Sequence, residues 1–261
     1  MEDKTLFNFI TQIKNEYENS SKCNNYRYLK LTKDLKNNEK YLFKPLEDIK
    51  DKKSNIKEKR NGFLVYSKET IDKNKELYDL YEKDYKNINK VDEINIFRFY
   101  YYEKLNNTNR LHATIIMINP AFANSKKTDP TIRNIKSFFK NGYDNFGSFD
   151  IINLYPIRMP KSENLVSYLK KIRRETAYYR KFVKEFLFFN NKNNDGTKIL
   201  IASWGETLHA KAIKVFKGNH FKAFGLSKQK APLHFRRYSF LKKEIEEKIK
   251  KGIYKMAELD A

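Results

Sequence analysis

HATIIMIN, residues 112–119, is a nearly continuous apolar run that contains β-branched side chains. Such a run is typical of a strand buried on both faces of a sheet. Three later segments have a similar pattern: FDIINLYPI (149–157), KILIASWG (198–205) and HFKAFGLS (220–227). These segments predict the centre of the fold.

Segments with helical spacing of apolar residues separate these strands. They are TIRNIKSFFKNG (131–142), the region 165–189, and ETLHAKAIKVFKG (206–218). Strands that alternate with helices predict an α/β fold, with a three-layer α/β/α arrangement around a central, mostly parallel sheet. We expect this domain to cover residues 62–240.

The flanking regions have other patterns. Residues 1–61 predict an N-terminal extension that packs on or flanks the main domain, with a helix over 6–17 and a charged linker over 48–61. Residues 241–261 predict a basic C-terminal helix, whose amphipathic pattern covers 240–256. Within the domain, we expect further strands at 63–66 and 94–102 and a helix at 69–85.

The charge of the chain is strongly positive. In 261 residues, Lys and Arg total 54 and Asp and Glu total 32, which gives a net charge of +22. This excess suits the binding of a polyanion, with nucleic acid as the leading candidate, although a compositional bias toward lysine would also produce it. The 20 Phe and 18 Tyr exclude a long disordered chain, because so much aromatic surface must be buried or bound.

Several classes of protein do not fit the composition. A single cysteine excludes a disulfide scaffold, and with only four histidines it argues against a zinc site. No apolar run approaches the roughly 20 residues that span a bilayer, and the start is acidic where a signal peptide is basic. We expect a cytoplasmic protein that needs no metal or organic cofactor.

In open α/β sheets, ligands bind beyond the carboxyl ends of the parallel strands. The residues at those positions are therefore the first candidates for function. They are Asn119-Pro120, Asn153 with Tyr155, Trp204-Gly205, and the loop from Gly225 to His234.

Each of these candidates has a functional and a structural interpretation. Asn119, held by Pro120, could position a water molecule or serve only as a turn residue. Asn153 could pair with the edge of a base or be a satisfied buried amide. His234 precedes Arg236 and Arg237, which should disfavour its protonation, but it could also be a surface histidine.

Other candidates have simpler interpretations. Asp129 most simply caps the helix that starts at Thr131, with a general-base role as the alternative. Trp204 fits a packing aromatic. We expect His112, His209 and His220 to be structural.

The strand-end motifs together resemble a bacterial family of uncharacterised domains, over about residues 62–240. At a greater distance, their order resembles the uracil-DNA glycosylase superfamily. The motifs are Asn119-Pro120, the Asp-Pro-Thr-x-Arg start at Asp129, the strand-end Asn153, Trp204-Gly205, and the loop that carries His234.

The resemblance implies a monomeric, monofunctional DNA glycosylase with a uracil-DNA-glycosylase-like fold, acting on a flipped base in duplex DNA. Catalysis would fall to Asn119, which positions water, and His234, which donates a hydrogen bond to the departing base. The residues that contact the base would be Asn153, Tyr155, Ala121 and Phe122, although Phe122 could equally be a core residue. Contacts to DNA phosphates would come from Lys228, Lys230, Arg236 and Arg237.

Three positions depart from the glycosylase pattern. The final motif is His-Phe instead of His-Pro-Ser-Pro. Asn119 stands where the uracil-specific branch has Asp, which implies slow chemistry or an activated substrate. Ala121 stands where that branch has a Tyr that excludes C5 substituents, so we expect a C5-modified pyrimidine as substrate and a possible role in antiphage defence.

Two other functions remain open. The chain could be a catalytically inactive basic module that binds nucleic acid. It could also be an enzyme of nucleosides or nucleotides, whose charge attracts phosphate; a steep salt dependence of binding to long duplex DNA would argue against this.

Overall fold

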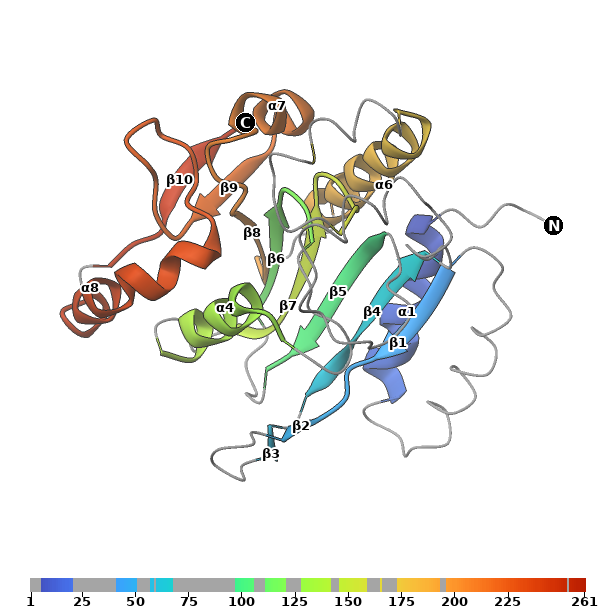
Figure 1. Cartoon of the computed structure of the whole chain (residues 1–261), viewed down its shortest axis with the longest axis horizontal. Helices are drawn as coiled ribbons and strands as arrows, with labels where there is room; N and C mark the ends of the chain where they lie inside the picture. Colours follow the sequence, from blue (N-terminus) through green and yellow to red (C-terminus); the bar gives the residue numbers. More distant parts are fainter. Residues whose placement is uncertain are drawn as a thin grey trace, which may run out of the picture.

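The computed structural model describes residues 6–20, 41–50, 57–58, 60–67, 97–105, 111–120, 128–141, 146–158, 165, 173–192, 196–252 and 254–261. Over these residues the fold is α/β, with one mixed sheet in the order β1-β4-β5-β7-β6-β8-β9-β10 (Figure 1). The strands of that sheet are β1 (Tyr41–Pro45), β4 (Asn61–Ser67), β5 (Arg98–Lys104), β6 (Leu111–Met117), β7 (Phe146–Asn153), β8 (Lys198–Ala202), β9 (His220–Ala223) and β10 (Ala257–Asp260).

Five α-helices accompany the sheet in the described part of the chain. They are α1 (Leu6–Ser20), α4 (Pro130–Asn141), α6 (Arg173–Lys192), α7 (His209–Phe216) and α8 (Tyr238–Lys250). Two short strands, β2 (Ile49–Lys50) and β3 (Lys57–Glu58), form a separate pair. The helix expected at 69–85 lies outside the described residues. None of the described helices is both long and apolar enough to cross a membrane.

The centre of the sheet is parallel, as the apolar runs predict. β7, β6, β8 and β9 are neighbours in parallel orientation, with Met117 opposite Asn153 and Ile116 opposite Ala202. Six of the seven residues of β6 are buried, which confirms the buried strand expected at 112–119. The carboxyl ends of these strands therefore lie at one edge of the sheet.

The prediction of a mostly parallel sheet is wrong, because both flanks are antiparallel. β1 with β4, β4 with β5, β5 with β7, and β9 with β10 all pair in antiparallel fashion. A strand buried on both faces shows the same apolar run whether its neighbours are parallel or antiparallel, so the pattern carries no information on direction.

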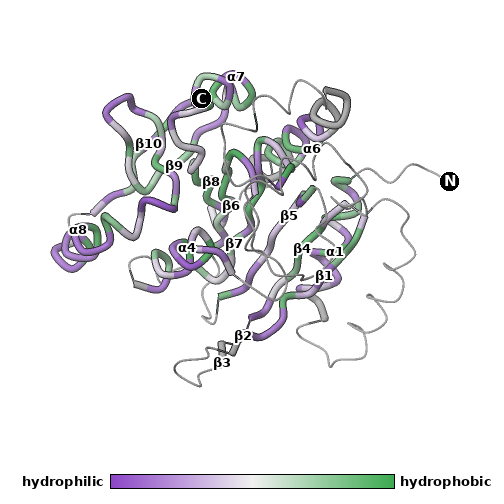
Figure 2. Tube along the Cα trace, in the orientation of Figure 1, coloured by the Kyte–Doolittle hydropathy of each residue, from purple (hydrophilic) through white to green (hydrophobic). Residues whose placement is uncertain are grey.

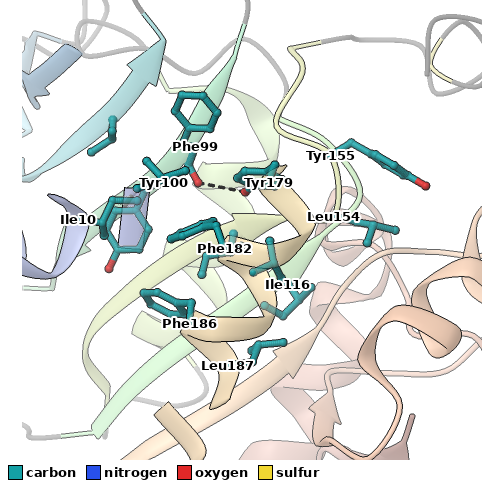
Figure 3. Close-up of a cluster of buried hydrophobic side chains, with 14 of the residues drawn as sticks. Ile10, Phe99, Tyr100, Ile116, Leu154, Tyr155, Tyr179, Phe182, Phe186 and Leu187 are labelled. Carbon is teal, nitrogen blue, oxygen red and sulfur yellow. Dashed lines mark hydrogen bonds between the residues drawn. The ribbon is translucent and has the colours of Figure 1, made fainter. Parts of the chain in front are cut away.

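Each face of the sheet carries its own hydrophobic cluster. One cluster joins the sheet to residues of α1, α6 and α7, and the other joins it to residues of α4 and α8. Figure 3 shows part of the first, where Tyr179, Phe182 and Phe186 of α6 lie near Tyr100 and Ile116 of the strands. In β4, β6 and β8 alternate residues serve the two clusters, so a side chain's position in the strand decides which face it joins. β5 departs from this alternation, because Phe99 and Tyr100, beside a shift in its register with β4, both join the first cluster.

The residues before position 62 belong to the same core. α1 confirms the helix expected at 6–17, and Leu6, Phe9, Ile10 and Ile13 are buried in the first cluster. β1 extends the sheet beyond β4. The N-terminal segment thus contributes both a helix and an edge strand to the fold.

The C-terminal helix is shorter than the sequence predicts. α8 ends at Lys250, and Gly252 adopts φ +67°, a left-handed conformation that commonly ends a helix. The chain then turns back, and Ala257–Asp260 forms β10 against β9. Figure 2 shows α8 mostly in the colours of hydrophilic residues. The predicted amphipathic pattern over 240–256 therefore covers a helix, a turn and the approach to an edge strand.

Gly62 yields a first prediction about stability. It lies in β4 opposite Glu103, where an added Cβ would overlap the Tyr102 carbonyl oxygen and lie 2.8 Å from the Glu103 Cα. Because both obstacles are backbone atoms, we expect Gly62→Ala to lower the free energy of unfolding by about 1–3 kcal/mol in urea titrations. Gly225→Ala is the control, since its nearest neighbour is the movable Leu233 side chain. Equal losses for the two variants would contradict this explanation.

Candidate functional site

The segments that follow β6, β7 and β8 are hydrogen-bonded to one another at the carboxyl edge. The Leu154 N–H donates to the Met117 carbonyl at 2.7 Å, and the Tyr155 N–H donates to the Ile118 carbonyl at 2.8 Å. On the other side, the Ser203 N–H donates to the Ile116 carbonyl at 2.8 Å. These bonds hold the residues after the three strands in one neighbourhood.

Asn153 is the last residue of β7 and is 1% exposed. Phe149 and Ile151, four and two residues earlier, lie in the cluster under α4 and α8, so alternation places the Asn153 side chain on that face. Its Oδ1 makes no hydrogen bond within the described part of the chain. A buried carbonyl acceptor without a partner costs about 1–3 kcal/mol, which is the cost a polar ligand would remove.

Asn119 lies in the bend after β6 and is partly buried. Its Nδ2 donates to the carbonyl of Pro120 at 3.4 Å, so the amide turns toward the segment that follows. Ala121 and Phe122 lie in that segment, outside the described residues. Their roles stay predictions.

The loop that carries His234 is attached to the end of β8 through Ser203. The Ser203 hydroxyl donates to the Leu233 carbonyl at 3.2 Å and accepts from the Phe235 N–H at 2.9 Å. The Gly205 N–H donates to the Pro232 carbonyl at 3.0 Å. A Cβ added to Gly205 would lie 3.8 Å from the Cβ of His234. The structure therefore brings His234 to the same edge as Asn119 and Asn153.

His234 is a neutral hydrogen-bond donor at physiological pH. Burial lowers the pKa of His234 to about 4; the charge of Asp129 opposes this shift and that of Arg236 adds to it. Its Nδ1 accepts from the Arg236 N–H at 3.1 Å, so the single ring proton resides on Nε2. The expectation of a neutral ring agrees with this pKa, although burial is a larger cause than the neighbouring arginine.

Asp129 caps α4, as the sequence predicts. Its Oδ1 accepts from the Ile132 N–H at 2.9 Å, and the helix begins at Pro130, one residue before the expected start. The electrostatic effect of its carboxylate reaches both His234 and Arg98. The beginning of α4 therefore adjoins both the His234 loop and the start of β5.

Four basic side chains around His234 are exposed. Lys228 and Lys230 lie at the tip of a tight turn. A hydrogen bond closes this turn, in which the Ser227 N–H donates to the Ala231 carbonyl at 2.8 Å. Arg236 and Arg237 belong to the short 3-10 helix that follows His234. All four side chains are therefore accessible to solvent.

Tyr155 lies apart from the other candidates. It is 1% exposed and belongs to the hydrophobic cluster on the α6 side of the sheet, the face opposite to the Asn153 side chain. The guanidinium of Arg180 lies 5.6 Å from its ring centre (Figure 3 shows the ring beside Leu154). The structure does not bring Tyr155 together with Asn153.

Trp204 has the packing role that the sequence suggests. Its ring centre lies 5.4 Å from that of Phe216 and 5.3 Å from that of Phe221, and its Nε1 donates to Nδ1 of His209 at 3.0 Å. It supports the end of β8 from the α7 side.

The sequence interpretation missed three buried polar residues at the same edge. Arg98 at the start of β5, Arg158 after β7, and Tyr66 in β4 are 2%, 5% and 1% exposed. A charged residue inside an apolar strand segment, as Arg98 is in FRFYYY, is the signal that could have identified them.

A second polar cluster lies on the α1 side of β6 and β7. The fully buried Asp150 accepts from the Tyr100 hydroxyl at 2.7 Å, lies 2.9 Å from Nε2 of His112, and accepts from Lys14 of α1 at 3.2 Å. The Ser148 hydroxyl lies 2.7 Å from Nδ1 of His112. His112 is thus part of a buried network, in line with the structural role expected for it.

Among comparisons with known proteins, the family model described as "Protein of unknown function (DUF1643)" matches residues 98–234. This interval begins at Arg98 and ends at His234, so it includes Asn119, Asn153 and the strands that position them. Searches of curated proteins and of solved structures found no match.

Proposed function

The chain belongs to the DUF1643 family, and from the residues at its carboxyl edge we propose that it is a DNA glycosylase that flips out and hydrolytically removes a pyrimidine base. One observation carries the proposal. Two amides and a neutral imidazole, from Asn119, Asn153 and His234, gather at one edge of the sheet although the chain separates them widely. These groups match the needs of N-glycosidic bond hydrolysis.

His234 has the protonation state that this reaction requires. As the glycosidic bond lengthens, negative charge develops on the oxygen of the departing base, and the sugar becomes cationic. A neutral imidazole with its proton on Nε2 can donate a hydrogen bond to that oxygen. A donor held in place before the reaction stabilises charge where it develops, without a cost of reorganisation.

Asn153 provides recognition of the base. An amide presents one acceptor and one donor side by side, which complements the hydrogen-bonding edge of a pyrimidine. Its Oδ1 makes no other hydrogen bond in the described part of the chain, so it is available to a base that enters the protein. Such a base must first leave the helical stack, at a cost of a few kcal/mol.

Asn119 and the basic residues complete the mechanism. Asn119 would position the attacking water, while the exposed Lys228, Lys230, Arg236 and Arg237 bind phosphates on either side of the flipped nucleotide. The small Ala121 leaves room for a C5 substituent, which favours a modified pyrimidine and a role in antiphage defence.

The finer features of the fold belong to the same proposal. We place the chain with the uracil-DNA glycosylase superfamily, in a three-layer α/β/α arrangement, acting as a monomer in the cytoplasm. Support comes from the order of the strand-end residues along the chain and from the hydrophobic cluster on each face of the sheet.

Base release from defined duplexes tests the proposal. The full chain is incubated with duplexes that carry uracil, mismatched thymine or a bulky C5-modified cytosine, and abasic sites are then cleaved with alkali. We expect the strongest cleavage with a C5-substituted base. Release of uracil alone would contradict the role of Ala121. Tight duplex binding with no base released from any substrate would instead support the inactive binding module.

A further inference from the structure

Helix α4 contacts the loop that carries His234 along one side. Its Asn134 side chain donates from Nδ2 to the Phe235 carbonyl at 2.9 Å and to the Arg236 carbonyl at 3.3 Å. One turn later in α4, the ring centre of Phe138 lies 5.6 Å from that of Phe235. Residues four apart share one face of a helix, so Asn134 and Phe138 together fix where α4 meets this loop.

A single peptide group joins Asn134 to the imidazole of His234. The carbonyl of Phe235 and the N–H of Arg236 belong to the same peptide bond. Asn134 donates to that carbonyl, and the N–H donates to Nδ1 of His234 at 3.1 Å. Because a peptide group is planar, a hydrogen bond that orients its carbonyl also orients its N–H. A donor at the carbonyl also polarises the group, which strengthens the N–H as a donor.

Ser203, just after β8, holds the two preceding peptide groups. Its hydroxyl donates to the Leu233 carbonyl at 3.2 Å and accepts from the Phe235 N–H at 2.9 Å. These two groups belong to the peptide bonds on either side of His234, and Ser203 is fully buried. Three successive peptide groups, from Leu233 to Arg236, are therefore hydrogen-bonded to side chains of other elements. The His234 side chain projects from a backbone that is held in place.

The hydrogen bond at Nδ1 decides where the ring proton of His234 lies. A neutral imidazole carries one ring proton, and the partner of one nitrogen determines whether the other is protonated. The Arg236 N–H occupies Nδ1 and leaves the proton on Nε2. The Phe235 carbonyl also accepts from the Tyr238 N–H, so the peptide group keeps one bond when Asn134 is removed. The effect of Asn134 on the ring is therefore partial.

We propose that Asn134 is a positioning residue for His234, which keeps the ring proton on Nε2 and fixes the direction in which it points. The inference rests on the proposed function, and it adds the side chain that sets the hydrogen-bond donor in place. It also gives a role to the Asp-Pro-Thr-x-Arg motif. Asp129 of that motif caps α4, the helix that carries Asn134 to the His234 loop.

Nitrogen NMR of the full chain tests the inference without any reaction. The chemical shifts of the two ring nitrogens report which of them carries the proton, and the spectrum of His234→Ala identifies the His234 signals. At neutral pH, we expect the proton on Nε2 alone in the natural chain. In Asn134→Ala, we expect a measurable fraction of the rings to carry it on Nδ1, because the Arg236 N–H is held less firmly. Asn134 is only partly buried, so the variant should keep the fold.

Asn219→Ala is the matched control for this variant. The Asn219 side chain also donates to a carbonyl, that of Phe216 at the end of α7, at 2.8 Å. Its loss removes a hydrogen bond of the same kind without touching the His234 loop. We expect the His234 signals of Asn219→Ala to equal those of the natural chain. Asn134→Ala rings that keep the proton wholly on Nε2, or an equal change in Asn219→Ala, would overturn the inference.

Base release then shows whether the position of the ring matters to the reaction. Groups that orient a histidine in metal sites are worth about 10- to 100-fold, and Asn134→Ala should slow single-turnover release about tenfold with duplex binding unchanged. The loss is smaller than for His234→Ala because the ring remains. A full rate of release, or a loss confined to binding, would overturn the inference. A change in the ring proton in a chain that releases no base would support the inference about Asn134 and contradict only the proposed glycosylase.

Discussion

Asp150→Asn is expected to lower the free energy of unfolding by about 3–5 kcal/mol, the range for removing one partner of a buried charged pair. Asp150 is fully buried, and its Oδ2 is shared by Tyr100, His112 and Lys14 at 2.7, 2.9 and 3.2 Å. Asparagine keeps the size of the side chain but removes the charge. The variant therefore removes the carboxylate that pairs with the ammonium group of Lys14, whose side chain is only 18% exposed. Urea unfolding followed by circular dichroism measures the loss.

Glu244→Gln is the matched control for this variant. Glu244 pairs with Lys248 one turn later on α8, but both side chains are largely exposed. Exposed pairs of this kind contribute about 0.3–0.5 kcal/mol. A loss for Asp150→Asn that is no larger than the loss for Glu244→Gln would show that the buried network adds little to stability.

Asp150 also makes the stability sensitive to acid. Burial alone would raise the pKa of Asp150, but the charges of His112 and Lys14 and the hydrogen bonds it accepts hold that pKa well below its usual range. The pKa in the folded state is thus lower than in the unfolded state, where it is about 3.9. The resulting stability is present above about pH 4 and is lost as the pH falls below it. The unfolding free energy of Asp150→Asn should therefore depend less on pH than that of the natural chain in this range.

The contrast between β6 and Asp150 shows that a local sequence pattern can predict a buried strand but not a polar contact between distant residues. The run at 112–119 identifies a buried strand because most of its residues are apolar and favour the interior. Asp150 and His112 occur inside such runs as isolated polar residues. Their partner Lys14 is 136 residues away from Asp150 in the chain. No local pattern links the two, so the network appears only when α1 packs on the sheet.

The candidate site also has a part that the sequence predicts and a part that it does not. The rule that ligands bind beyond parallel strand ends was enough to bring Asn119, Asn153 and His234 to one edge, because it depends on strand direction alone. It could not separate Asn153 from Tyr155, since that requires knowing which face each residue joins. The buried Arg98 and Tyr66 meet through the antiparallel pairing of β4 with β5, which a buried apolar pattern does not reveal.

His234→Ala is expected to slow base release about 100- to 1000-fold, the usual effect of removing one donor that stabilises a developing oxyanion. DNA binding should change little, because the exposed lysines and arginines around the loop remain. Single-turnover rates with the preferred duplex, together with binding to the same duplex, separate the two effects. His220→Ala is the control, since His220 is exposed and lies on β9, where Asp260 and Glu258 of β10 pair with it.

The pH dependence of the same reaction separates a neutral donor from a general acid. Because the pKa of His234 is about 4, its ring stays neutral from about pH 5.5 to 8.5, and the His234 contribution to the rate should be constant over that range. The ratio of the natural rate to the His234→Ala rate measures this contribution directly, since other titrating groups cancel. A ratio that falls as the pH rises through this range would mean that the protonated imidazole is the active form. The hydrogen bond from the Arg236 N–H to Nδ1 would then have to break during the reaction.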